Sequence, residues 1–146
     1  MVWKPNVTVA AIVEQEGRFL LVEENTSQGV KLNQPAGHLE CGETLIEAIK
    51  REVLEETAYI FEPEFTTGIQ LWEKTSNDTT FLRVTFSGSV GQFFPNRELD
   101  TGIIQTVWLT PKEIENAAPR LRSPIVLNCV KDYVNGHIFP LSVIRP

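Results

Sequence analysis

Apolar and polar residues alternate along much of the chain in the way that half-buried β-strands require. Runs rich in Val, Ile, Phe and Thr are separated by segments of Gly, Pro, Asn and acidic residues, which are typical of turns. The predicted strands cover residues 2–13, 18–22, 65–72, 81–86 and 103–109. The first two are expected to pair as a hairpin around the turn Glu14–Gly17.

A different spacing marks one long helix in the first half of the chain. Leu45, Ile49 and Val53 recur every fourth residue, which is the period of a single buried helical face. Neither Gly nor Pro interrupts residues 43–59, and most of these residues favour helix. We therefore predict an amphipathic helix there.

Two shorter helices are predicted near the end of the chain. A Thr-Pro-x-Glu capping signature begins at Thr110, and the helix that it starts is expected to reach about Ala117. Ser123-Pro124 repeats the start signal before the amphipathic segment 125–134, and Gly136 is expected to end this last helix.

The remaining segments are polar or contain Pro and Gly, and we expect them to be loops. They are residues 25–29, 31–36, 62–64, 74–79 and 92–102. Strands and helices thus alternate irregularly, which predicts an α/β fold with a mixed sheet between helices. A chain of 146 residues is long enough for one domain, so a single domain is expected over residues 1–146.

Glutamates crowd one flank of the long predicted helix. Glu52 and Glu56 are one turn apart and Glu55 follows Glu52 by three residues, so their carboxylates repel one another. A divalent cation can compensate this repulsion, because carboxylate oxygens suit hard ions such as Mg²⁺ or Mn²⁺ that also bridge phosphates. Arg51 can neutralise part of the charge and orient the cluster. The alternative is a solvated helix face of mixed charges.

These glutamates belong to a longer pattern that starts at Gly37. Gly37, Glu43 and the segment 51–56 match the signature Gly, five residues, Glu, seven residues, Arg-Glu-aliphatic-any-Glu-Glu. On this match the chain resembles the Nudix hydrolases. The resemblance implies a Nudix-type α/β/α sandwich with a mixed sheet over nearly the whole chain. It also implies metal-dependent hydrolysis of substrates in which a diphosphate is linked to another moiety.

The resemblance further implies roles for the residues of the signature. It places Glu52, Glu55, Glu56 and the carbonyl oxygen of Gly37 around Mg²⁺, with Mn²⁺ as the other candidate ion. Glu55 and Glu56 are also catalytic candidates, because a bound metal activates water that must be positioned for attack. Arg51 completes the catalytic set as the residue that orients the acids.

Two residues at the end of the helix depart from the family pattern. Ala58 stands where the family usually has Gly, and Tyr59 stands where it usually has an aliphatic residue. Gly would let the helix end in a left-handed turn, a conformation that costs Ala about 1–2 kcal/mol. The departure therefore concerns the geometry of the helix end and removes no carboxylate.

Several residues outside the signature are candidates for substrate contacts. Arg83 lies in a predicted strand, where it either binds a substrate phosphate or pairs with a surface carboxylate on an edge strand. Arg122 precedes the last predicted helix, whose N-terminus favours phosphate. Gln34 and His38 flank the start of the signature, and a packed loop histidine is the alternative for His38.

Other residues leave two interpretations open. Glu98 and Asp100 lie in the predicted loop 92–102, and each is available as an acid additional to the signature. Solvated loop charges are the alternative for both. Trp72 can stack on a base or ring, or it can fill the core as most strand tryptophans do.

Composition narrows the class of partner. The net charge of −6 argues against bulk nucleic-acid binding, which needs a basic surface. A small di- or triphosphate stays compatible, because a bound metal inverts the local field. Cys41 and Cys129 are expected to be reduced thiols rather than a disulfide framework. No apolar run is long enough for a membrane span, so we expect a cytoplasmic monomer or homodimer.

Segments outside the signature narrow the resemblance further. NQPAGHLE, FLRVTF and LRSP are similar to the NudJ-type phosphatase branch of the family. This implies hydrolysis of a phosphoanhydride in nucleoside di- or triphosphates, or in thiamine-pathway pyrophosphates such as hydroxymethylpyrimidine diphosphate and thiamine diphosphate, with release of orthophosphate. The alternative is a non-catalytic nucleotide-binding or regulatory module of the same fold. Loss of one signature glutamate would favour that module, and all of them are present.

Overall fold

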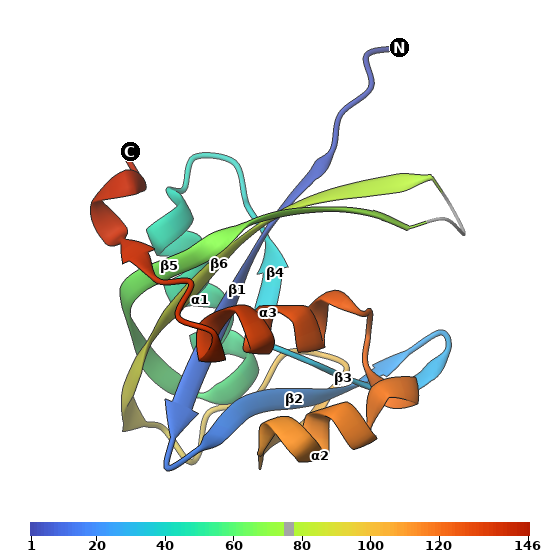
Figure 1. Ribbon diagram of the computed structural model, residues 1–146, viewed down its shortest axis with the longest axis vertical. Coiled ribbons are helices and arrows are strands. Elements are labelled where there is room, and N and C mark those ends of the chain that lie inside the picture. Colours follow the sequence, from blue (N-terminus) through green and yellow to red (C-terminus); the bar gives the residue numbers. More distant parts are fainter. Residues whose placement is uncertain (75–77) are drawn as a thin grey trace.

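The computed structural model describes residues 1–74 and 78–146, which form a mixed sheet packed between helices (Figure 1). The strands are β1 (Asn6–Gln15), β2 (Arg18–Thr26), β3 (Gly29–Asn33), β4 (Ala36–His38), β5 (Tyr59–Lys74), β6 (Thr79–Phe93), β7 (Ile103–Leu109) and β8 (Phe139–Pro140). The helices are α1 (Leu45–Thr57), α2 (Pro111–Asn116) and α3 (Ile125–Val134), with 3₁₀ turns at Ala118–Arg120 and Leu141–Val143.

The sheet is built around β1. On one side, this strand pairs parallel with β6. It also pairs antiparallel with β4 over Thr8–Ala10. Its far end pairs with β2 through a two-residue turn in which Glu16 and Gly17 both have positive φ, as a type I′ hairpin requires. The strand order is β3-β2-β1-β6-β5-β8, with β4 beside β1 and β7 beside β2. The sheet therefore contains both parallel and antiparallel pairs.

Helices cover both faces of this sheet, as Figure 1 shows. Alternate side chains of β1 pack on opposite faces of the sheet, because successive side chains of a strand point in opposite directions. Val9 and Val13 pack with Ile49 and Val53 of α1 in one apolar cluster. On the other face, Ile12 belongs to a second cluster that includes residues of α2 and α3. The α/β/α sandwich that the sequence indicates is thus the observed fold.

Both ends of α1 are fixed by local interactions. At the start, the hydroxyl of Thr44 accepts from the N–H of Glu47, and the Glu47 carboxylate accepts from the N–H of Thr44. At the end, Ala58 adopts the left-handed conformation with φ 64° and donates its N–H to the carbonyl of Leu54. The helix therefore ends with the turn that Gly usually makes, even though an alanine occupies the position.

The predicted elements agree best with the structure where the residue pattern is strongest. β7 and α3 have the predicted bounds, and β1, β2 and α1 are present within a few residues of theirs. Residues 25–29 and 31–36 were expected to be loops, and that prediction is wrong where β3 and β4 lie. Both strands are short and carry few β-branched residues, so their pattern is weak.

The predicted break at residues 62–64 is also wrong. β5 runs through it and absorbs Pro63 at a shift in its register with β6. β6 is longer than the predicted strand and extends to Phe93, into the expected loop 92–102. The turn predicted at residues 74–79 lies partly outside the described residues. Within the described ranges, no helix is both long and apolar enough to cross a membrane.

Candidate metal and phosphate site

A cavity of about 500 Å³ opens beside the C-terminal half of α1. Its size is within the range of small-molecule sites. The wall combines carboxylates of α1, the backbone of β4 and side chains of β5 and β6. Residues far apart in the sequence meet there, among them Gly37, Glu52, Trp72, Arg83 and Asp100.

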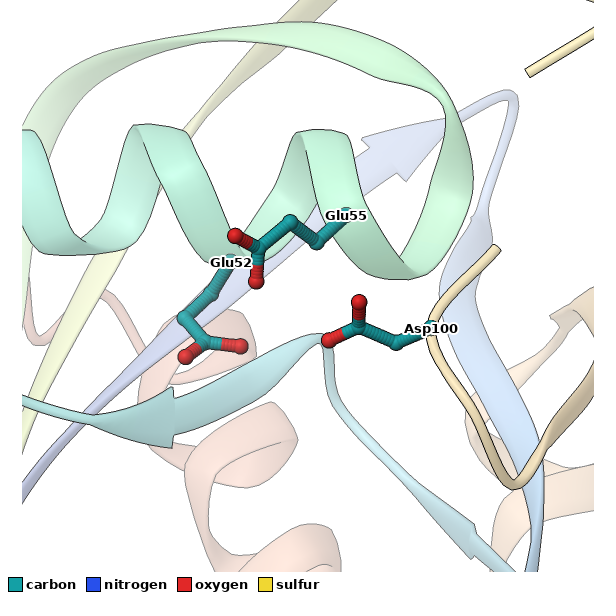
Figure 2. Close-up of side chains that lie close together, drawn as sticks. All are labelled: Glu52, Glu55 and Asp100. Carbon is teal, nitrogen blue, oxygen red and sulfur yellow. The ribbon is translucent and has the colours of Figure 1, made fainter. Parts of the chain in front are cut away.

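Three carboxylates converge in this cavity. The carboxylates of Glu52 and Glu55 on α1 lie close to that of Asp100, which extends toward them from the loop between β6 and β7 (Figure 2). One carboxylate oxygen from each of the three lies within 4.8 Å of the others. The N–H of Asp100 donates to the carbonyl of Glu55 at 2.9 Å, so the loop is held against the helix. The three oxygens are hard ligands, spaced so that one cation can bridge them.

Gly37 lets Glu52 reach the cavity past the edge of the sheet. A Cβ atom at Gly37 would overlap the carboxylate of Glu52, so any other residue would displace that side chain. Glu52 is buried, and its carboxylate lies against the backbone of β4. The glycine is therefore required by this close approach, and its backbone lines the cavity next to the acid cluster.

Glu56, like Glu52, is a buried acid of the cavity wall. Its Oε1 accepts from the N–H of Ala36 at 2.9 Å, which orients the carboxyl group toward β4. Burial, reinforced by the charge of Glu52, raises the pKa of Glu56 to about 9, although the hydrogen bond from Ala36 opposes the shift. In the absence of a bound metal ion, this group is mostly protonated at neutral pH.

Arg51 holds several of the acids in place. Its guanidinium makes two hydrogen bonds to Glu43, at 2.7 and 3.0 Å, and one to Glu52 at 2.7 Å. Further bonds reach Glu55 at 3.3 Å and the carbonyl of His38 at 3.0 Å. This single cation lowers the pKa of Glu43. For Glu52 and Glu55, burial raises the pKa more than Arg51 lowers it, so both pKa values remain raised.

Arg83 is buried on a central strand, so the alternative of an edge-strand ion pair is wrong. β6 lies between β1 and β5, and the structure shows no carboxylate within 4.0 Å of Arg83 among the described residues. Its Nη2 donates to Gln34 at 3.1 Å and to Asn33 at 3.3 Å, while its buried Nε has no partner in that part of the chain. Burial lowers the pKa of the guanidinium. Arg83 is thus a cation at the cavity wall without a close ion-pair partner among the described residues.

The other residues predicted to contact substrate lie at different depths. His38 and Arg122 line the cavity, where Arg122 pairs with Glu24 at 2.6 Å. Gln34 lies behind the wall: it is buried, donates to the carbonyl of Val126 and accepts from Arg83. The structure therefore gives Gln34 a place from which it positions Arg83.

The donor set fits a divalent metal ion. Glu52, Glu55, Glu56, Asp100 and the carbonyl of Gly37 offer only oxygen atoms, which suit Mg²⁺ and Mn²⁺ better than softer ions. Even with Arg51 beside them, the pKa values of Glu52 and Glu55 stay raised. A divalent cation beside them would remove that penalty, so the residues of this wall fit a bound metal ion.

The sequence makes Glu98 and Asp100 equal candidates for an additional acid, and the structure distinguishes them. Asp100 joins the cluster, whereas Glu98 is exposed and does not line the cavity. Both precede β7 in the same loop. Only the backbone contact of Asp100 with α1 distinguishes them, and such a contact leaves no signal in a single sequence.

Comparison with known proteins gives a consistent result. A family model described as the NUDIX domain matches residues 3–127. Phosphatase NudJ of Escherichia coli (strain K12) is 40% identical over 142 residues, which are 97% of this chain and 92% of that protein.

Solved structures agree over nearly the whole chain. A NUDIX hydrolase from Nitrosomonas europaea superposes with a TM-score of 0.95 at 51% identity, covering 98% of this chain and 97% of that one. The MutT protein from Methanosarcina mazei Go1 has a TM-score of 0.71 at 26% identity, covering 93% and 99% of the two chains.

Proposed function

Because the chain belongs to the Nudix hydrolase family, we propose that it hydrolyses the phosphoanhydride of a small di- or triphosphate in a metal-dependent reaction. The observation that carries this proposal is the convergence of Glu52, Glu55 and Asp100 beside the buried cation Arg83. Carboxylates that hold Mg²⁺ or Mn²⁺ and a guanidinium that binds phosphate are the two parts that such a reaction needs.

The metal would be held by Glu52, Glu55, Glu56 and the carbonyl of Gly37, with Asp100 as an additional ligand. When bound, it polarises a phosphoryl oxygen and lowers the pKa of coordinated water. Protein side chains position the water, orient the acidic residues and bind the phosphate.

Each protein group has a defined task in this proposal. Glu55, the more accessible of the two catalytic candidates, positions the attacking water. Glu56 is neutral at pH 7 in the metal-free protein and would ionise when a metal ion binds beside it. Arg51 keeps Glu52 and Glu55 in the orientation that the metal needs, because it bonds to both. Arg83, which lines the cavity, binds a non-bridging phosphate oxygen through its guanidinium.

The NudJ similarity supports a choice of substrate and product. The relative that is 40% identical carries the name phosphatase, which describes release of orthophosphate. We propose that water attacks the terminal phosphorus of nucleoside di- or triphosphates, or of hydroxymethylpyrimidine diphosphate and thiamine diphosphate. Arg122 and His38 are the remaining candidates for substrate contacts at this wall.

A panel of diphosphates and triphosphates assayed with Mg²⁺ tests this proposal. Phosphate release by the wild-type protein, its loss on chelation, and a fall of orders of magnitude in Glu56→Gln are expected. Turnover that survives exhaustive chelation contradicts the metal role. A folded protein that binds these compounds without hydrolysing any of them supports the non-catalytic module instead.

Hydrolysis in ¹⁸O-labelled water identifies the phosphorus that is attacked. Label is expected in orthophosphate, because water that attacks the terminal phosphorus leaves with that group. Label in pyrophosphate or in a nucleoside monophosphate shows attack at an internal phosphorus. That outcome overturns the product and leaves the hydrolase assignment in place.

A further inference from the structure

We propose that Trp72 and Phe81 form the binding surface for a planar aromatic ring on the substrate, so that the site selects a ring joined to a diphosphate rather than a particular base. This inference rests on the proposed function, because it assigns the second half of the same cavity. Neither residue belongs to the Nudix signature or to the acid cluster.

The two aromatic rings pack against each other at the cavity wall. Trp72 on β5 and Phe81 on β6 are directly paired in the sheet, and their rings stack with centroids 5.6 Å apart and planes inclined by 20°. His38 extends the surface, with its ring centroid 6.5 Å from that of Phe81. All of these residues line the cavity, and both stacked rings are half-buried. An apolar ring that enters here meets a preformed wall.

The surface lies next to the phosphate end of the cavity. Phe81 and Arg83 are two residues apart on β6, so their side chains leave the same face of the sheet about 7 Å apart. Arg83 in turn shares the cavity with the acid cluster. A ligand that places its phosphates between the acids and Arg83 therefore brings an attached ring to Phe81 and Trp72.

A stacking surface would accept different rings. Every planar heterocycle has a π-face, so a stacking surface holds many of them without reading their hydrogen-bonding edges. Lys74, two residues after Trp72 on β5, also lines this cavity. A surface of this kind suits pyrimidine and purine rings alike. Diphosphates that lack a ring are disfavoured only because they bind more weakly.

Trp72 also packs against the apolar cluster under α3, so its test must separate binding from folding. Trp72→Leu and Phe81→Leu keep apolar bulk but remove the π-face, and Trp72→Phe restores an aromatic ring. Leu71→Ala is the matched control. Leu71 is adjacent in the chain, but it points to the opposite face and is 69% exposed.

The measurement is calorimetric binding of two non-hydrolysable ligands in Mg²⁺. Uridine 5′-methylenediphosphonate carries a ring, and methylenediphosphonate does not. In Trp72→Leu and Phe81→Leu, the Kd of the first is expected to rise about tenfold and that of the second to stay unchanged, because only one ligand stacks. Trp72→Phe and Leu71→Ala should bind both nearly as the wild type does.

Tryptophan fluorescence gives an independent readout. The uridine ligand is expected to quench the wild-type signal and to leave that of Trp72→Phe unquenched, because a stacked ring quenches the indole it covers. Equal weakening of both ligands, or wild-type binding that does not favour the ring, overturns the inference. A protein that favours the ring but hydrolyses no diphosphate leaves the inference standing and removes the proposed hydrolase function.

Discussion

Gly37 and Glu52 approach each other so closely that no side chain fits between the β4 backbone and the carboxylate. In Gly37→Ala, the added methyl group should push Glu52 out of the acid cluster and lower the affinity for Mg²⁺ at least tenfold. Stability should change little, because the clashing carboxylate is the end of a flexible side chain that can move aside. Calorimetric Mg²⁺ titration measures the first effect and thermal unfolding the second. Gly91→Ala is the control, because a Cβ there meets nothing within 4 Å; equal Mg²⁺ affinity in both variants contradicts the role of Gly37.

Glu56 makes the metal-free protein sensitive to pH. Its pKa is about 9 in the folded state against an ordinary value of 4.5, so between these limits the folded state binds more protons than the unfolded state. The free energy of unfolding in EDTA should therefore fall as pH rises from about 4.5 to 9, by up to about 1.4 kcal/mol per pH unit for one proton. Thermal unfolding at pH 5, 7 and 9 measures this. The slope should be smaller in Glu56→Gln and unchanged in Glu98→Gln, whose carboxyl is exposed.

Arg83 is predicted to act through the fork of its guanidinium and not through charge alone. Arg83→Lys keeps a cation but loses the planar donors that bond to Gln34, Asn33 and phosphate together. The value of kcat/KM should fall roughly tenfold or more, mainly through KM. Arg120→Lys is the control, because Arg120 pairs with Glu23 and does not line the cavity. Unchanged kinetics in Arg83→Lys would remove the phosphate contact from the proposal.

At the scale of elements, the C-terminal end of α1 holds an alanine in a strained backbone conformation. Ala58 has φ 64°, and its methyl group is buried. In Ala58→Gly, relief of about 1–2 kcal/mol of strain is offset by a lost buried methyl and a freer unfolded chain, so stability should change by less than about 1 kcal/mol. Ala58→Val should destabilise by about 2 kcal/mol or more, because a β-branched residue is an outlier there. Urea unfolding tests both, and a fully stable valine variant contradicts the observed helix end.

Elements with a strong local signal could be predicted from the sequence. The capping signature at Thr110 and the amphipathic residues 125–134 identify α2 and α3, because both signals lie within the element itself. β5 could not be predicted in full, since Pro63 reads as a break. The sheet tolerates Pro63 only because the register with β6 shifts beside it, and that shift is set by the partner strand.

At the scale of the whole molecule, the signature residues could be named from the sequence, but the cavity could not. Glu52, Glu55 and Glu56 lie within one helix, so helical spacing already places them together. Asp100 joins them through a loop held by backbone bonds from Phe94 to Ala58 and from Asp100 to Glu55. These contacts depend on the residue at which β6 ends. The residue pattern placed that end too early in the chain.

Metal binding should stabilise the folded protein as a whole, because the acids of this site converge only in that state. For Mg²⁺ at about 100 times its Kd, mass action adds about 2.7 kcal/mol, which corresponds to a rise in Tm of roughly 5–10 °C for a domain of this size. Differential scanning calorimetry over a Mg²⁺ series measures the rise. It should vanish in the double variant Glu52→Gln, Glu56→Gln and persist in Glu98→Gln, which removes a charge outside the cavity. An equal rise in all three proteins means that Mg²⁺ acts on the general charge of the surface, and the metal site proposed beside α1 is then wrong.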